Sequence, residues 1–113
     1  MKVKKGEVWD ANLSPSKGSE QRGYRPVLIV SGNLLNTYSP VVFVCPMTSK
    51  IKNYKGNLII EPNKSNGLSH QSEVLNLHLR SISKVRLLKK LGIIDKKDLA
   101  LVRNGVRDII EMD

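Results

Sequence analysis

The side chains that could carry chemistry in this sequence are few, and they exclude most catalytic arrangements. Cysteine occurs once, as Cys45 at the end of an apolar stretch, and histidine occurs twice, as His70 and His78. These residues do not form a ligand set with the spacing of a metal site. The sequence also lacks the glycine-rich phosphate loops of dinucleotide-binding and P-loop proteins. Chemistry is therefore left to arginine, glutamate, serine, threonine and histidine, and we expect no cofactor.

This set of side chains suits the cleavage of RNA by its own 2′-hydroxyl. The hydroxyl attacks the adjacent phosphate when a base removes its proton, and the extra charge on the phosphorane must then be stabilised. The 5′-oxygen leaves protonated, and no step requires a metal ion. Arg25 can hold two phosphate oxygens, Thr48 offers a hydroxyl donor, and Glu20 or a histidine could move protons.

The charge of the chain favours a polyanionic partner without establishing one. Lys and Arg number 19 and Asp and Glu number 10, so the formal net charge is +9. Lys50, Lys52 and Lys55 follow Thr48 in a polar stretch, where they would attract phosphates. The same excess could serve solubility alone. One Trp, one Phe and three Tyr provide few platforms on which bases could stack.

The 113 residues predict a single domain, 1–113, with one core. Short apolar runs rich in β-branched residues are separated by turn residues, and Asn66-Gly67 is one such turn. The predicted strands are residues 7–13, 26–30, 41–45, 58–60 and 73–83. The chain contains no apolar run of about 18 residues, and its basic start leads into no secretory signal. We therefore expect a cytoplasmic protein that does not contact the membrane.

The last segment predicts a helix of about four turns that packs on the sheet. Asp95 is a candidate N-cap, and Asp98 follows three residues later. Apolar residues then recur at steps of three and four, at Leu99, Val102, Val106 and Ile109. A second short helix is predicted at 84–91. Many short strands followed by one helix indicate a mainly β fold, a small curved barrel with a C-terminal helix.

The order of residues in the first loop is more specific than this chemistry. Gly18-Ser19-Glu20-Gln21 leads to Arg25-Pro26, Cys45-Pro46-Met47-Thr48-Ser49 follows, and Gln71-Ser72-Glu73-Val74 and Leu79-Arg80-Ser81-Ile82 come later. These segments resemble the MazF/PemK/Kid family of toxin endoribonucleases from about residue 6 to the C-terminal helix. The resemblance implies an SH3-like barrel of the CcdB/Kid/PemK type, usually a homodimer. It also implies sequence-specific, metal-independent cleavage of single-stranded RNA to 2′,3′-cyclic phosphate and 5′-hydroxyl ends, which blocks translation and growth.

The resemblance also implies the site residues and a protein partner. Arg25 and Thr48 match the family's catalytic pair at the scissile phosphate. The remaining predicted RNA contacts are Ser19, Glu20, Gln21, Ser72, His78 and Arg80. His78 and Arg80 are expected to alternate on one strand and to share one face. A cognate antitoxin would occupy the RNA channel with its flexible tail.

Departures from the family pattern narrow the mechanism. Kid-like members carry a histidine where this chain has Ser19, and the family's aspartate is replaced by Ser83. Gln71 stands where many relatives have aspartate, and His78 stands where they often have glutamine. A histidine–aspartate–arginine mechanism therefore cannot be carried over, whereas the arginine–threonine mechanism survives.

Two alternatives belong to other functional classes, because one fold can carry several functions. One is a CcdB-like inhibitor of DNA gyrase, and the other is a basic module that binds RNA or protein without cleaving it. The loop string ending in Arg25-Pro26, together with Thr48, favours the nuclease. A gyrase inhibitor would need exposed apolar residues at its C-terminus, whereas this chain ends Ile109-Ile110-Glu111-Met112-Asp113.

Overall fold

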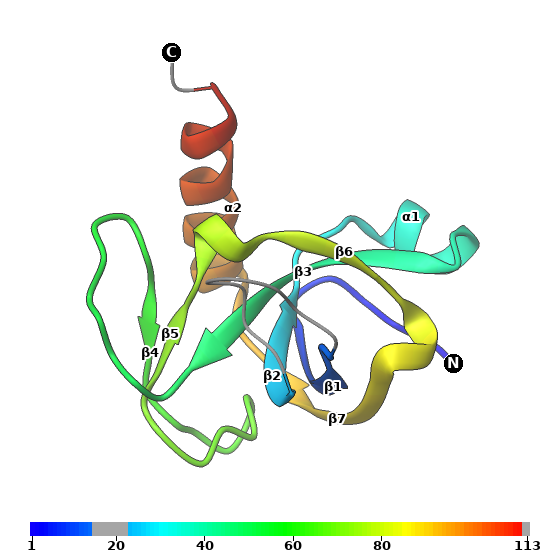
Figure 1. Cartoon of the computed structure of the whole chain (residues 1–113), viewed down its shortest axis with the longest axis horizontal. Coiled ribbons are helices and arrows are strands. Elements are labelled where there is room, and N and C mark those ends of the chain that lie inside the picture. Colours follow the sequence, from blue (N-terminus) through cyan, green and yellow to red (C-terminus); the bar gives the residue numbers. More distant parts are fainter. Residues whose placement is uncertain (15–22, 112–113) are drawn as a thin grey trace.

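The computed structural model describes residues 1–14 and 23–111, which form a strongly curved sheet covered at one side by a C-terminal helix (Figure 1). The strand order is β4-β5-β3-β2-β1-β7, and β6 pairs with β3 outside this path. The elements in chain order are β1 (Glu7–Asn12), β2 (Tyr24–Ile29), α1 (Asn33–Tyr38), β3 (Val41–Thr48), β4 (Ile59–Ile60), β5 (Ser72–Val74), the 3-10 helix η1 (Asn76–His78), β6 (Arg80–Ser83), the 3-10 helix η2 (Lys84–Arg86), β7 (Leu87–Ile93) and α2 (Lys96–Glu111).

Strand β3 is the element from which the site is built. Its first half pairs with β6, its middle with β2, and its end with β5. Successive side chains of a strand point to opposite faces, so Val42 and Val44 enter one core cluster while Cys45 and Met47 enter the other. From Val44 to Met47 the apolar run is therefore buried on both faces, whereas Phe43 is exposed. The strand ends at Thr48, which is still buried and lies between β2 and β5.

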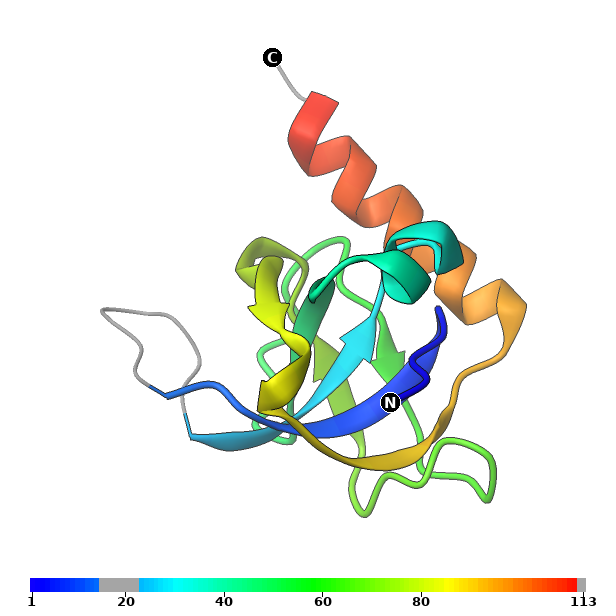
Figure 2. The ribbon, with the colours of Figure 1, turned by 90° about the vertical axis from the view of Figure 1, so that its right-hand side faces the viewer.

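Helix α2 follows the sequence prediction closely. The Asp95 carboxylate accepts a hydrogen bond of 2.8 Å from the Asp98 amide, as expected of an N-cap. Leu99 and Val102 are buried in the second core cluster, and Val106 packs against it. Figure 2 shows that the far end of the helix extends past the sheet. Among the described residues, no helix has the length and apolar character needed to cross a membrane.

Two local predictions were wrong, and one short helix was missed. The segment 84–91 is helical only over Lys84–Arg86 and then continues as strand β7, because pairing with β1 satisfies its backbone. The stretch 73–83, predicted as strand, is interrupted by the 3-10 helix η1 between β5 and β6. Helix α1 was not predicted. It contains Asn36, a buried residue whose side-chain amide nitrogen donates to the Ser31 carbonyl oxygen at 2.8 Å.

Candidate active site

Arg25 and Thr48 are brought together by the pairing of β2 with β3. In this antiparallel pair Val27 lies opposite Pro46 and Leu28 lies opposite Cys45. The same register, continued by two residues, sets Arg25 opposite Thr48. Opposed residues point to the same face, with Cβ atoms about 5 Å apart. Two residues 23 positions apart in the sequence thus present a guanidinium and a hydroxyl to one surface.

This surface forms one side of a cavity of about 440 Å³, which we call the basic cavity. It is lined by Arg25, Thr48, Lys50, Lys52, Tyr54, Leu75 and His78. Only 6% of Thr48 is exposed, and its hydroxyl oxygen accepts a hydrogen bond of 3.1 Å from the Lys50 amide. The accepting hydroxyl keeps its own proton and can donate it to an oxygen in the cavity. The basic cavity therefore combines cations with a fixed hydroxyl donor, as the binding of a phosphate requires.

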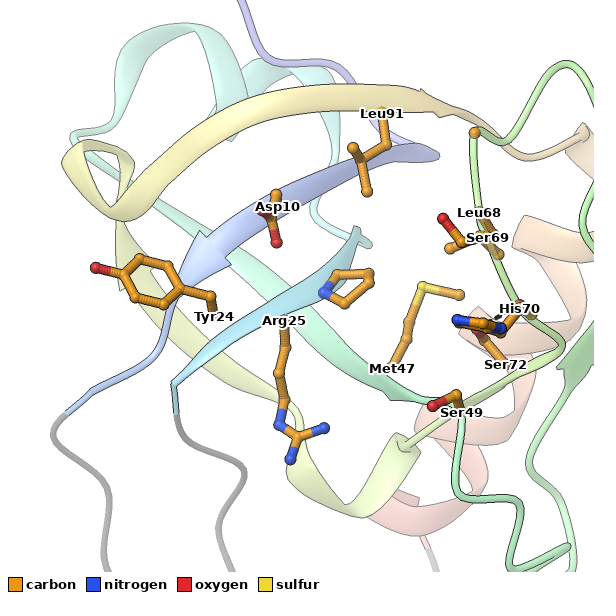
Figure 3. A pocket seen from close by; sticks show the side chains of 12 residues that line it. Asp10, Tyr24, Arg25, Met47, Ser49, Leu68, Ser69, His70, Ser72 and Leu91 are labelled. Atoms are coloured by element: carbon orange, nitrogen blue, oxygen red, sulfur yellow. Dashed lines mark hydrogen bonds between the residues drawn. The ribbon is translucent and has the colours of Figure 1, made fainter.

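A second cavity of about 420 Å³ begins on the other side of Arg25, and we call it the mixed cavity (Figure 3). It contains the carboxylate of Asp10, the imidazole of His70 and an apolar floor that includes Met47. Further lining groups are the hydroxyls of Ser49, Ser69 and Ser72. Asp10 and His70 stand on opposite sides of this space in Figure 3. Arg25 lines both cavities, so the two cavities meet at this residue.

The wall of the basic cavity that carries Lys52 and Tyr54 rests on a buried carboxylate, Glu73 of β5. Its oxygens accept hydrogen bonds from the amides of Lys52 (2.7 Å), Asn53 (2.8 Å) and Tyr54 (2.9 Å), and from the side-chain amide of Asn57 (2.8 Å). Burial by itself raises the pKa of Glu73, but these four hydrogen bonds outweigh it, and its pKa lies below the ordinary value. The carboxylate is therefore charged at neutral pH.

The structure separates the other predicted site residues. His78 lines the basic cavity, and Ser72 lines the mixed cavity, where its hydroxyl donates to the His70 carbonyl oxygen at 2.9 Å. Arg80 lies on β6 opposite Val44 and lines neither cavity. The prediction that His78 and Arg80 alternate on one strand was wrong, because His78 ends η1 before β6 begins. The predicted contacts Ser19, Glu20 and Gln21 lie outside the described residues.

Sequence reasoning missed Asp10, Tyr54 and Glu73. Glu73 lies in a short strand between buried residues, where a carboxylate must be hydrogen-bonded, but the sequence alone did not reveal this burial. Asp10 and Tyr54 carried no signal in the sequence either. Of the three lysines expected to attract phosphates, Lys50 and Lys52 line the basic cavity and Lys55 does not.

Cys45 and the acidic and histidine side chains exclude two further kinds of chemistry, a cysteine nucleophile and a metal site, among the described residues. Burial raises the pKa of the Cys45 thiol to about 12, so this residue is part of the core and no nucleophile. Across residues 1–14 and 23–111, no three His, Cys, Asp or Glu side chains are grouped so that they could hold a metal ion. The groups that line the two cavities are thus a guanidinium, amines, hydroxyls, imidazoles and the carboxylate of Asp10.

Comparison with known proteins gives a consistent result. Residues 4–110 match the family described as PemK-like, MazF-like toxin of type II toxin-antitoxin system. The chain is 37% identical to the endoribonuclease MazF of Staphylococcus saprophyticus over 105 residues, covering 92% of this chain and 88% of that protein. It is 38% identical to the endoribonuclease EndoA of Bacillus subtilis over 107 residues, covering 89% and 92%.

A solved structure of MazF from Deinococcus radiodurans superimposes with a TM-score of 0.85 at 28% identity and covers 99% of both chains. This similarity confirms the predicted fold, a mainly β, SH3-like barrel with a C-terminal helix.

Proposed function

The chain belongs to the PemK-like, MazF-like toxins of type II toxin–antitoxin systems and is an endoribonuclease, and from this premise we propose that Arg25 and Thr48 are its catalytic residues. The observation that carries the proposal is the β2–β3 register, which sets these two side chains on one face at the edge of the basic cavity. In the reaction the 2′-oxygen loses its proton and bonds to phosphorus, while the bond from phosphorus to the 5′-oxygen breaks and that oxygen takes up a proton. The products are a 2′,3′-cyclic phosphate and a 5′-hydroxyl.

Arg25 acts on the phosphorane, whose non-bridging oxygens carry more negative charge than those of the substrate. A guanidinium can donate to both of these oxygens at once in a fixed planar geometry. Because Arg25 lies beside Pro26 on a strand whose following residues are buried, its backbone is held in place before the substrate binds. The hydrogen bonds thus gain strength as charge develops, and this gain is what lowers the barrier.

Thr48 supplies a second donor to the same oxygens. Its hydroxyl oxygen is engaged by the Lys50 amide at 3.1 Å, which fixes the position of the oxygen and leaves its proton for the ligand. Its burial between β2 and β5 restricts the side chain further. Together the two residues form a donor set for the transition state that requires no metal ion.

The two cavities that meet at Arg25 accept different parts of a single RNA strand. Lys50 and Lys52 attract backbone phosphates along the basic cavity, where His78 also contacts the RNA. A carboxylate repels phosphates but accepts hydrogen bonds from the amino groups of bases, so the mixed cavity with Asp10 takes a base. Duplex RNA could not place a base there, because its bases are stacked and paired.

Further predictions concern the partners and the location of the protein and its other RNA contacts. The family description implies an antitoxin partner, and we propose that this partner blocks the RNA site. The expected homodimer and the expected cytoplasmic location stay predictions, as do RNA contacts by Ser19, Glu20, Gln21 and Arg80.

One experiment tests the proposed reaction. The purified protein is incubated with a long single-stranded RNA in excess EDTA, and the new 5′ ends are mapped and tested for phosphorylation by a kinase. We expect cleavage at a short recurrent sequence, with 5′-hydroxyl ends that accept a phosphate directly. Loss of cleavage in EDTA with recovery on addition of a divalent ion, or 5′-phosphate ends, would overturn the mechanism.

A further inference from the structure

We propose that Glu73 is a positioning residue for RNA binding, holding the wall of the basic cavity in the conformation that presents Lys50, Lys52 and Tyr54 to the RNA. The inference rests on the proposed function of that cavity. Glu73 does not line the cavity itself, so it acts through the segment that does.

The segment concerned, residues 49–58, has little structure of its own. It follows β3 and precedes β4, and it contains no helix or strand. A hydrogen bond of 3.1 Å from the Asn57 amide to the Tyr54 carbonyl oxygen closes one turn within it. Asn53 has a φ of 55°, in the left-handed region that non-glycine residues enter at a cost. Such a segment needs an external anchor to keep its lysines in one place.

Glu73 provides that anchor through a dense set of contacts. Three consecutive backbone amides, those of Lys52, Asn53 and Tyr54, converge on its carboxylate within 2.9 Å, and the Asn57 side chain completes the set. The left-handed conformation of Asn53 lies at the centre of these amides, as in the concave anion sites that successive N–H groups form. The carboxylate is 0% exposed, so water does not compete for these hydrogen bonds.

The position of Glu73 in the sheet links this anchor to the catalytic residues. In the β3–β5 pair Glu73 lies directly opposite Thr48, which itself lies opposite Arg25 when the β2–β3 register is continued. Arginine, threonine and glutamate thus occupy adjacent strands in one row. The row fixes the distance between the phosphate-binding wall and the catalytic donors, because both depend on the same backbone pairing.

A second buried carboxylate, Glu7, offers a matched control. It is 3% exposed and accepts hydrogen bonds from the Lys4 amide (2.9 Å) and the Trp9 indole (3.0 Å), and it pairs with Lys90 at 3.0 Å. Its pKa is lowered against the effect of burial, as that of Glu73 is. None of its partners lines the basic cavity. Loss of Glu7 should therefore reduce stability without reaching the RNA site.

The test compares Glu73→Gln and Glu7→Gln in the full chain. Glutamine keeps the shape of the side chain, but it replaces one carboxylate oxygen with an NH2 group. This group cannot accept the hydrogen bonds of the two N–H donors that face that position. The substrate is an RNA containing the mapped cleavage sequence, and its uncleavable analogue carries a 2′-O-methyl group at the cleaved nucleotide. For Glu73→Gln we expect KM and the Kd of the analogue to rise about tenfold while kcat changes less than about threefold, because phosphate contacts act on ground state and transition state alike.

Three readouts separate positioning from a general loss of folding. Glu7→Gln should leave Kd and KM within about twofold of the original protein, even where its melting temperature falls. Lys52→Ala should weaken binding in the original protein but add little to Glu73→Gln, since the lysine is no longer held. If Glu73→Gln does not fold, Asn57→Ala removes one donor while retaining the charge, and it should raise Kd about threefold.

Contrary results are equally defined. Equal effects of Glu73→Gln and Glu7→Gln on Kd, additive effects of Lys52→Ala and Glu73→Gln, or a fall in kcat at unchanged KM would overturn the positioning role. Failure of the proposed function has a different signature, since Arg25→Ala would then cleave RNA as fast as the original protein.

Discussion

The basic cavity and the mixed cavity meet at Arg25 and have similar volumes of about 440 and 420 Å³, but their chemistry differs. One presents Lys50 and Lys52, and the other presents a carboxylate, hydroxyls and an apolar floor. The first is suited to the repeating phosphates of a nucleic acid, whereas the second is suited to a base. The proposed function thus separates affinity and sequence preference in space and places the reaction between the two cavities.

The two cavities arise from the alternation of side chains on the same strands. Arg25 and Thr48 share one face of the β2–β3 pair, and Pro26 and Met47, one position along each strand, share the other. Pro26 and Met47 line the mixed cavity, and Thr48 lines the basic cavity. A short antiparallel pair thus builds two subsites. Arg25 at the start of β2 is long enough to serve both.

The largest effect is expected from Arg25, which both cavities share. Arg25→Ala should lower kcat by about 10³-fold or more while changing the Kd of the uncleavable RNA far less, because its hydrogen bonds strengthen in the transition state. Single-turnover cleavage and filter binding measure the two quantities. Arg25→Lys keeps the charge and loses the planar pair of donors, so it should recover only a small part of the rate. Cleavage at the original rate by Arg25→Ala would place the reaction elsewhere.

A smaller effect is expected from Thr48, which lines only the basic cavity. Thr48→Val preserves the shape of the buried side chain and removes the hydroxyl, and it should lower kcat by up to about 10²-fold, as the loss of one oxyanion donor does. Thr48→Ser retains the hydroxyl and serves as the control, with a rate within about fivefold of the original. Equal rates for the valine and serine variants would show that the hydroxyl does not donate to the transition state.

The elements that build the two cavities could be predicted from the sequence only in part, because some of them depend on contacts between distant segments. Continuous β-branched runs predicted β2 and β3, and the N-cap at Asp95 with the stripe from Leu99 predicted α2, because local periodicity determines such elements. The strand character of 87–93 depends on pairing with β1, a distant segment, so local pattern could not reveal it. The residues of the site likewise fall into those that the sequence indicated and those that it did not. The family pattern named Arg25 and Thr48, whereas Asp10 and Glu73 became visible only when the sheet register was known.

The smallest effect on rate, and the most informative on sequence preference, is expected from Asp10 in the mixed cavity. Asp10→Asn retains the size of the side chain but replaces an acceptor oxygen with a donor, so a base that donates an amino hydrogen loses its partner. Cleavage of the preferred sequence should fall less than about tenfold. At one position next to the cut, the free-energy difference by which one base is preferred over another should change by about 1–3 kcal/mol. Sequencing the ends of a randomised RNA pool after cleavage measures this change.

Asp108→Asn on the exposed side of α2 alters the net charge equally and lines neither cavity, so it should leave the ranking unchanged. A general gain in affinity in both variants, with no change in preferred bases, would mean that Asp10 acts only through its charge. The mixed cavity would then be a second phosphate site, and the contrast between the two cavities would disappear. A changed base preference confined to Asp10→Asn instead assigns the reading of sequence to the mixed cavity, because the rest of the charge distribution is matched between the two variants.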